Sequence, residues 1–510
     1  MAHWIILPVV LPALVAPFII MVLRHHLDLQ RIFSVASCIT LVVMCAALVA
    51  DAADGTITVY ELGNWPAPFG IVLVLDRLSA MMVLLTSLLG LIIVLYAIWS
   101  RWDEKGRHFH ALMQFQLMGV LGAFLTGDAF TLFVFFEVLL IASYGLMTHG
   151  GGALRQRAGV QYVVYNLIGS TLFLFALGVL YGVTGTLNMA DLAVKVADLP
   201  PEDTALIRVG AILLLLVFAV KAAVLPLHFW LPAAYSNAPA PVAAFFAIMT
   251  KVGSYAILRM YTLVFGPEQA ATLGVASDWL LYAALLTVSA GMIGVLGARD
   301  IGRMTAFGAI GSTGTLLIAI ALFDQTSAAA AIYYMVHSPL AAAMLFLVVD
   351  LITARRSGAI EVGKPMPESG ILSVLFFAAA IALAGMPPLS GFVGKLLVMN
   401  AAWGNPDVVL VWGVILVTSL AAILGLARAG SMIFWKAYDA EATQGNATQS
   451  AEGVAEPAPR LPIIAVFALL VAIIAMTVFA GRMMQYAEAT AAQLFDTQHY
   501  IGAVLKQGEP

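Results

Sequence analysis

Long apolar runs, separated by short polar connections, follow one another along almost the whole chain. A run of about 20 mostly apolar residues is long enough to cross the hydrocarbon core of a membrane as a helix. The pattern therefore predicts an all-α polytopic membrane protein with about fourteen transmembrane helices. The predicted spans lie near 4–23, 32–50, 71–99, 109–127, 129–147, 161–183, 206–227, 240–265, 279–298, 303–323, 328–353, 371–400, 408–435 and 462–483.

The composition agrees with a membrane protein and argues against other classes. Hydrophobic residues make up 62% of the 510 residues and charged residues only 10%, whereas soluble domains carry about 25% charged residues. The net charge is −4 and the chain has no basic run, so nucleic-acid binding has no support. The segment 436–461 is polar and of low complexity, and we interpret it as a cytoplasmic loop before the last span.

Basic residues concentrate in every second connection. The connections after odd-numbered spans hold most of the 24 lysines and arginines, among them Arg101, Arg155 and Arg355, whereas the even-numbered connections are richer in aspartate and glutamate. Basic connections stay on the cytoplasmic side of a membrane. The pattern therefore places both termini outside the cytoplasm.

Two predicted spans are interrupted by proline, and each of them carries a lysine. The seventh holds Lys221 and then Pro226, and the twelfth holds Pro387 and Pro388 and then Lys395. Proline removes a backbone donor, and such breaks are tolerated inside a membrane only where the backbone faces protein or water. Two broken helices five spans apart indicate two inverted five-helix repeats, formed by spans 4–8 and 9–13. The predicted units are an N-terminal three-helix segment (1–108), a first repeat (109–265), a second repeat (266–435), the polar loop (436–461) and a last helix with a short tail (462–510).

Four ionisable residues lie inside predicted spans: Glu137, Lys221, Lys251 and Lys395. A charge near the bilayer centre costs roughly 2.5–3.5 kcal/mol on insertion scales, so each of these residues is a candidate for function. Burial favours the neutral amine of a lysine, and a nearby carboxylate favours the ammonium. A pair of Glu137 and Lys221 that forms and separates would thus act as a proton switch. Lys251 would then receive the proton through water, and Lys395 would be the last site before exit.

His337, in the eleventh predicted span, is a candidate relay between Lys251 and Lys395, because imidazole titrates near neutral pH. A histidine that only packs and hydrogen-bonds is an equally good interpretation. Lys395 lies near the end of its span, where a lysine can instead extend its ammonium to the membrane surface. Asp128 lies in a predicted tight turn and is interpreted as a helix cap. No cluster of carboxylates makes a convincing Na⁺ site.

Three motifs resemble the antiporter-like membrane subunits shared by respiratory complex I and Mrp-type cation/proton antiporters. They are LVFAVKAAVLPLHFWLPAAYSNAPAPVAAFFAIMTKVGSYAILR (216–259), GDAFTLFVFFEVLLIASYGLM (127–147) and GMPPLSGFVGK (385–395). The resemblance covers most of residues 60–435. Within it, ELGNWPAPFGIVLVLDRLSA (61–80) is most similar to the D-type subunits of multisubunit Mrp antiporters.

The resemblance implies a secondary-transport subunit rather than an enzyme. It implies exchange of Na⁺ for H⁺ without a cofactor, in a complex with other Mrp subunits in a bacterial inner membrane. The proton path that it implies consists of Glu137, Lys221, Lys251, His337 and Lys395.

The sequence departs from the family pattern in two places. Ala341 stands where many relatives carry a lysine, so the link between Lys251 and Lys395 would depend more on water. Ala233 stands where many complex I relatives have an aspartate.

Two alternative functions remain open. One is a proton-pumping subunit of complex I or of a membrane-bound hydrogenase. Lys395 argues against the M-type complex I subunit, which usually has glutamate there, and the short C-terminal tail argues against the L-type. The other is a structural subunit that conducts nothing, which the cost of four buried charges argues against.

Overall fold

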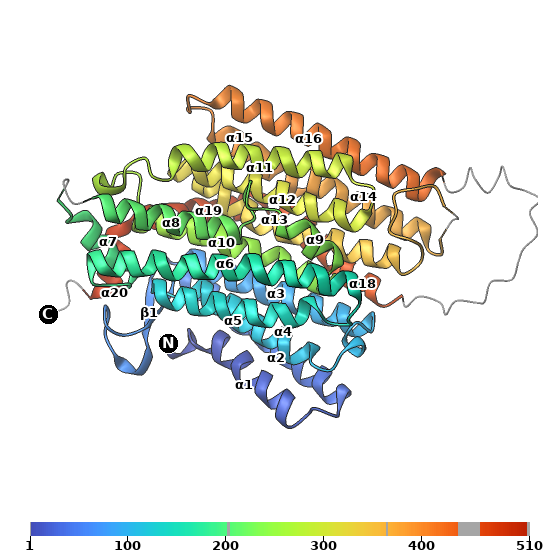
Figure 1. The fold of residues 1–510 in the computed structure, drawn as a ribbon, viewed down its shortest axis with the longest axis horizontal. Coiled ribbons are helices and arrows are strands. Elements are labelled where there is room, and N and C mark those ends of the chain that lie inside the picture. The colour runs from blue at the N-terminus through green and yellow to red at the C-terminus, as the bar shows by residue number, and fades with distance from the viewer. Residues whose placement is uncertain (1, 201–203, 364–365, 437–459, 507–510) are drawn as a thin grey trace, which may run out of the picture.

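The chain folds into a bundle of long helices, described by a computed structural model for residues 2–200, 204–363, 366–436 and 460–506 (Figure 1). The helices before the middle of the chain are α1 (Leu7–Met21), α2 (Leu27–Ala52), α3 (Arg77–Trp99), α4 (Phe109–Leu125), α5 (Ala129–Met147), α6 (Ala153–Thr184), α7 (Met189–Ala197), α8 (Ala205–Lys221), α9 (Trp230–Asn237) and α10 (Ala240–Leu263). Those that follow are α11 (Ser277–Gly297), α12 (Ile301–Ala321), α13 (Gln325–Thr353), α14 (Ser369–Ala384), α15 (Ser390–Ala401), α16 (Val408–Gly430), α18 (Pro462–Val478), α19 (Ala480–Phe495) and α20 (Thr497–Leu505).

Nine helices of the described residues are long and apolar enough to cross a membrane, or ten if the bent pair α18 and α19 counts as one span. The chain is therefore a helical, polytopic membrane protein. Three further apolar helices, α1, α4 and α14, are shorter than a full span. The number of about fourteen spans stays a prediction. The helices that would complete this number are short or interrupted.

Three helices form the centre of the bundle. Within their most apolar stretch, α10 is 100% buried and α12 and α13 are each 94% buried, whereas α16 is only 28% buried. The central helices pack against one another, and α13 also contacts α14, α15, α18 and α19. Side chains on these three helices are therefore screened from lipid by protein on every side.

Both predicted helix interruptions are present. The α8 helix ends at Lys221 and the next helix, α9, begins at Trp230, while α14 ends at Ala384 and α15 begins at Ser390. Gly385, the first residue after α14, has a φ of 76°, a left-handed conformation that glycine adopts without strain. Each break thus leaves a lysine beside non-helical backbone in the interior of the bundle.

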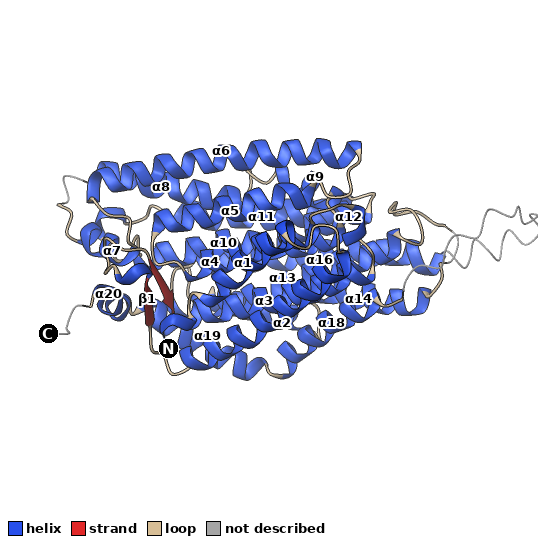
Figure 2. Ribbon diagram, turned by 90° about the horizontal axis from the view of Figure 1, so that it is seen from below, coloured by secondary structure: helices blue, strands red, loops and turns tan. Residues whose placement is uncertain are grey.

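A small cap of other elements covers one end of the bundle. It consists of an antiparallel hairpin of β1 (Thr58–Glu61) and β2 (Val72–Leu75), together with α7 and α20 (Figure 2). The first and last described residues lie at this same end (Figure 1). Aspartates begin several of the helices: Asp128, for example, accepts a hydrogen bond from the Thr131 amide at 2.7 Å, which confirms its interpretation as a cap.

The last predicted span, 462–483, is bent. The chain turns by 77° between α18 and α19, and α19 packs against α13. The sequence of α19 carries polar residues such as Arg482, Gln493 and Glu488 among its apolar ones, so this helix is more polar than α18.

Candidate functional site

Lys221 is held at the end of α8 by polar atoms of α6. Its Nζ donates hydrogen bonds to the Asn166 carbonyl and to Ser170 Oγ, each at 3.3 Å, and only 5% of the residue is exposed. The ammonium also lies 5.9 Å from the centre of the Phe136 ring. Because burial is nearly complete, the ammonium of Lys221 does not extend to a membrane surface.

Glu137, next to Phe136 on α5, is half-buried, and its Oε1 is buried without a hydrogen-bond partner. The carboxylate is close enough to interact electrostatically with Lys221. Among the described residues, however, no ion pair joins the two side chains. The structure therefore places the predicted Glu137–Lys221 pair together but in a separated arrangement.

Lys251 lies at the centre of the bundle, on α10, and is completely buried. Its Nζ donates to Thr250 Oγ1 at 3.2 Å and to Thr313 Oγ1 of α12 at 3.1 Å. Two residues further along α10, a Cβ on Gly253 would lie 2.9 Å from the amide nitrogen that follows Lys221. This close approach of α10 to the end of α8 puts Lys221 and Lys251 at the same level of the bundle.

His337 lies on α13 and connects this helix to the second break. Its Nδ1 is 2.8 Å from the Oγ of Ser390, the first residue of α15, and the residue is 1% exposed. A Cβ on Gly391 would lie 2.9 Å from the Nε2 atom, so only glycine allows α15 to approach the ring this closely. Both Lys251 and Lys395 are close enough to His337 to interact with it electrostatically.

Lys395 lies on α15 and turns back to the break that precedes it. Its Nζ donates to the carbonyl of Ala384, the last residue of α14, and to Ser419 Oγ of α16, each at 2.8 Å. The residue is 5% exposed, so its ammonium stays inside the bundle. Each break thus has a buried lysine beside it, Lys221 directly before the first and Lys395 after the second.

Sequence reasoning did not identify the groups that hold these lysines. They are uncharged oxygen atoms, namely the backbone carbonyls of Asn166 and Ala384 and the hydroxyl groups of Ser170, Thr250, Thr313 and Ser419. The signal that could have found two of them is their spacing, because Asn166 and Ser170 are one helical turn apart in an otherwise apolar run.

Sequence reasoning also missed a buried ion pair. Arg259, on α10, lies 2.6 Å from Asp76 Oδ2, and the two residues are 5% and 3% exposed. Arg259 lies in the same predicted span as Lys251, so the cost of a charge at membrane depth would have identified it as well. Its partner comes from the start of α3, far away in the sequence.

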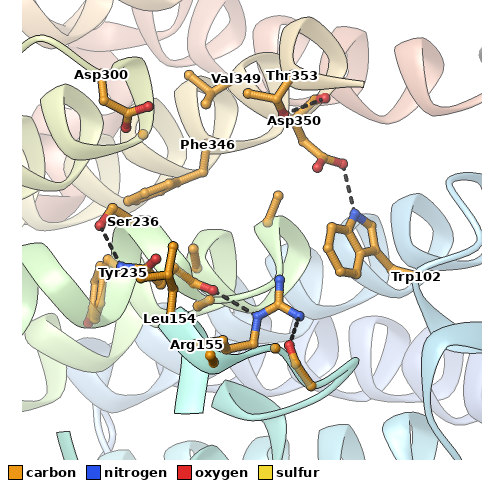
Figure 3. A pocket seen from close by; sticks show the side chains of 18 residues that line it. Trp102, Leu154, Arg155, Tyr235, Ser236, Asp300, Phe346, Val349, Asp350 and Thr353 are labelled. Atoms are coloured by element: carbon orange, nitrogen blue, oxygen red, sulfur yellow. Dashed lines mark hydrogen bonds between the residues drawn. The ribbon is translucent and has the colours of Figure 1, made fainter. Parts of the chain in front are cut away.

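A cavity of about 510 Å³ lies where α6, α10 and α12 begin and α13 ends (Figure 3). Trp102, Arg155 and Asp350 line it, and Asp350 Oδ2 accepts a hydrogen bond from Trp102 Nε1 at 2.9 Å. Ala243, which also lines it, precedes Lys251 by eight residues, or about 12 Å along a helix. The lining of the cavity therefore ends about two helical turns from Lys251 along α10.

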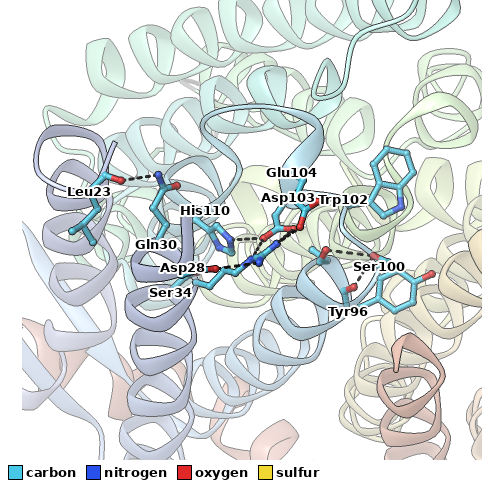
Figure 4. Close-up of polar contacts among 12 residues, drawn as sticks. Leu23, Asp28, Gln30, Ser34, Tyr96, Ser100, Trp102, Asp103, Glu104 and His110 are labelled. Carbon is cyan, nitrogen blue, oxygen red and sulfur yellow. Dashed lines mark hydrogen bonds and ion pairs between the residues drawn. The ribbon is translucent and has the colours of Figure 1, made fainter. Parts of the chain in front are cut away.

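A network of charged residues stabilises the connection between α3 and α4 (Figure 4). Arg31 donates from Nε and Nη2 to the two carboxylate oxygens of Asp103 at 2.6 and 3.1 Å, and His110 Nε2 is 3.2 Å from Oδ2. Burial alone raises the pKa of Asp103, but the hydrogen bonds and charges of His110 and Arg31 outweigh it and hold this pKa below its ordinary value. The network is structural, because it lies away from the buried lysines.

Comparisons with known proteins identify relatives of the chain over nearly its full length. A family described as "NADH:quinone oxidoreductase/Mrp antiporter, TM" matches residues 126–423. A protein of Rhizobium meliloti, named as the D-type subunit of a probable K⁺/H⁺ antiporter, is 39% identical, over 96% of this chain and 95% of its own length. A protein of Alkalihalophilus pseudofirmus, named as the D-type subunit of a Na⁺/H⁺ antiporter, is 38% identical, over 99% of this chain and 100% of its own length.

Solved structures agree with these sequence relatives. A chain of the Mrp complex from Dietzia matches with a TM-score of 0.86 and 30% identity, covering 99% of this chain and 100% of that chain. A chain of respiratory complex I from Thermus thermophilus matches with a TM-score of 0.78 and 24% identity, covering 96% and 99%. The second match shows a shared fold alone.

Proposed function

Because the chain belongs to the family of membrane subunits shared by NADH:quinone oxidoreductases and Mrp antiporters, we propose that it is a proton-translocating, D-type subunit of a multisubunit monovalent cation/proton antiporter. Relatives with 37–39% identity are named as Na⁺/H⁺ or K⁺/H⁺ antiporter subunits. The subunit is a secondary transporter rather than an enzyme, and its partners are the other subunits of the complex.

One observation carries the proposal: three lysines are buried in the bundle, and no carboxylate of the described residues is bonded to any of them. Lys221, Lys251 and Lys395 are each at most 5% exposed, and each donates to hydroxyl or carbonyl oxygens. The cost of a buried ammonium without a carboxylate is relieved whenever its proton leaves. Such groups are suited to gain and lose protons during transport.

The proton path begins at Lys221, whose charge Glu137 controls by approach and separation. Lys251 receives the proton, His337 relays it, and Lys395 releases it beside the second helix break. Water reaches these groups at the non-helical backbone of the two breaks.

The arrangement of the helices supports two repeats of opposite topology, 109–265 and 266–435, within a bundle of fourteen spans. Each repeat contains one broken helix, and each break lies beside a lysine. We place the protein in a bacterial inner membrane with the hairpin end outside. The even-numbered connections, which lie at that end, carry few basic residues.

Transport by variants of the intact complex tests the path. The complete complex, carrying Lys221→Ala or Glu137→Ala, is expressed in cells that lack other antiporters, and the pH gradient that Na⁺ or K⁺ dissipates is measured in everted vesicles. Both variants are expected to lose transport while the complex assembles. The matched control is Lys195→Ala, which removes an exposed lysine of α7 and is expected to transport normally.

Full transport by assembled Lys221→Ala and Glu137→Ala complexes would show that the path is wrong. A second measurement separates an antiporter from a redox-driven pump. Purification of the native complex, followed by identification of its subunits, is expected to yield membrane subunits alone. Flavin or iron–sulfur subunits in the purified complex would contradict the proposed function.

A further inference from the structure

A cluster of buried hydroxyl groups joins α12 to α13 in the centre of the bundle. Ser312 Oγ of α12 lies 2.7 Å from Ser338 Oγ and 3.3 Å from the Tyr334 hydroxyl, both on α13. These three residues are at most 1% exposed. Buried hydroxyl groups need hydrogen-bond partners in an apolar environment, and these three are partners of one another.

Each end of the cluster adjoins a residue of the proposed path. Ser312 precedes Thr313, whose Oγ1 accepts the hydrogen bond from Lys251. Ser338 follows His337, and the ring of Tyr334 lies 5.5 Å from the His337 ring. The cluster therefore lies on the same turns of α12 and α13 as Thr313, which contacts Lys251, and His337.

A proline interrupts the backbone hydrogen bonding of α13 next to the cluster. Pro339 lies inside α13 directly after Ser338, and proline has no amide hydrogen to donate to the carbonyl four residues earlier. That carbonyl belongs to Met335, in the same turn as His337. A carbonyl freed in this way inside a membrane requires a polar group or water nearby, so the backbone makes the surroundings of the cluster more polar still.

We propose that Ser312 and Ser338, with Tyr334, form a hydroxyl bridge that passes protons between Lys251 and His337. A serine hydroxyl both donates and accepts a hydrogen bond. It therefore takes a proton on one side as it gives its own to the next oxygen on the other, and each O–H bond that breaks is replaced by a new one. The Lys251 ammonium becomes an amine, the His337 imidazole becomes an imidazolium, and water completes the contact at either end.

This bridge rests on the proposed function, and its test uses the same assembled complex. Ser312→Ala, Ser338→Ala and the double variant are compared with Thr305→Val. The last change removes another buried hydroxyl of α12, one that donates to the Ile301 carbonyl two turns away from the cluster. The rate of cation-driven proton transport is measured in H₂O and in D₂O, and assembly is checked by purification with the partner subunits.

The transport rate of the double variant is expected to fall at least about tenfold. A positioned proton-transfer group raises a rate about 10²–10⁴-fold, and water that enters the space of the lost hydroxyl groups would supply part of this effect. Its solvent isotope effect is expected to rise as proton transfer becomes rate-limiting, which a purely structural loss would not cause. Thr305→Val is expected to retain the rate and isotope effect of the unmodified complex. If the double variant does not assemble, the single variants are judged by the same isotope effect.

A double variant that assembles and transports with an unchanged rate and isotope effect would overturn the bridge. Lys251→Ala separates this outcome from failure of the proposed function. If Lys251→Ala is inactive while the serine variants are normal, the path stands and only the bridge fails. If Lys251→Ala itself transports normally, the path fails as well.

Discussion

The buried ion pair of Arg259 and Asp76 provides a quantitative test of how this bundle is stabilised. The two side chains lie 2.6 Å apart and are almost fully buried. Asp76 also caps α3, since its carboxylate accepts a hydrogen bond from the Ser79 amide at 2.8 Å. Arg259 lies over the rings of Tyr255 and Tyr500, at 5.6 and 5.4 Å from their centres. The pair thus links α10 to the start of α3 and to the C-terminal helix α20.

Arg259→Leu is the informative perturbation, because it leaves the Asp76 carboxylate buried with no opposite charge. Breaking a buried pair from one side costs about 3–5 kcal/mol. The double variant Asp76→Asn/Arg259→Leu removes both charges and keeps an oxygen that can accept the Ser79 hydrogen bond. Replacement of a whole buried pair is often close to neutral, so we expect this variant to lose no more than about 2 kcal/mol.

The free energy of unfolding is measured on the purified complex in detergent for the two single variants and the double variant. The matched control is Lys506→Ala, which removes a partner of Glu61 from a pair whose lysine side chain is 54% exposed. Such a surface pair is worth about 0–1 kcal/mol. The reasoning is refuted if Arg259→Leu costs no more than Lys506→Ala, or if the double variant is less stable than Arg259→Leu.

Two further predictions concern a close helix contact and a charged network. Gly391→Ala is expected to slow transport at least about tenfold and to destabilise the protein by about 1–3 kcal/mol, because its Cβ would press on His337 and on the end of α14. Gly413→Ala, on the open face of α16, is the matched control and should change neither quantity. Asp103 has a lowered pKa in the folded protein, so its contribution to stability is present above the ordinary value of 3.8 and is lost as the pH falls below it. Thermal unfolding between pH 3 and pH 7 should show Asp103→Asn less stable than the unmodified complex at pH 7, with a difference that shrinks as the pH falls below 3.8; a constant difference would contradict this.

The sequence could predict that these lysines are buried but not which atoms hold them. A lysine inside a long apolar run is visible from the sequence alone, because its cost depends only on membrane depth. The helix breaks were predictable as well, because a proline lacks the amide hydrogen that a helix requires at that residue. The partners of Lys251 and Lys395 come from α12 and α16, and contacts between distant helices leave no periodic signal in one sequence.

Two predictions show where the information in the sequence ends. Glu137 and Lys221 were expected to form a pair that opens and closes. The structure brings them together without a bond, a detail that depends on side-chain conformations of α5, α6 and α8. The span predicted at 462–483 was placed by hydropathy, but the 77° bend after α18 depends on the packing of α19 against α13.

Among the described residues, buried arginine side chains and buried lysine side chains have different kinds of partner. Two of the largely buried ion pairs are made by arginine, Arg259 with Asp76 and Arg355 with Glu368, and arginine does not release its proton in proteins. The interior lysines are held by hydroxyl and carbonyl oxygens instead. A carboxylate would favour the ammonium over the amine, whereas a hydroxyl can accept from the ammonium and donate to the amine. Hydroxyl partners therefore stabilise both states of a lysine, which is the property that a site for a moving proton requires.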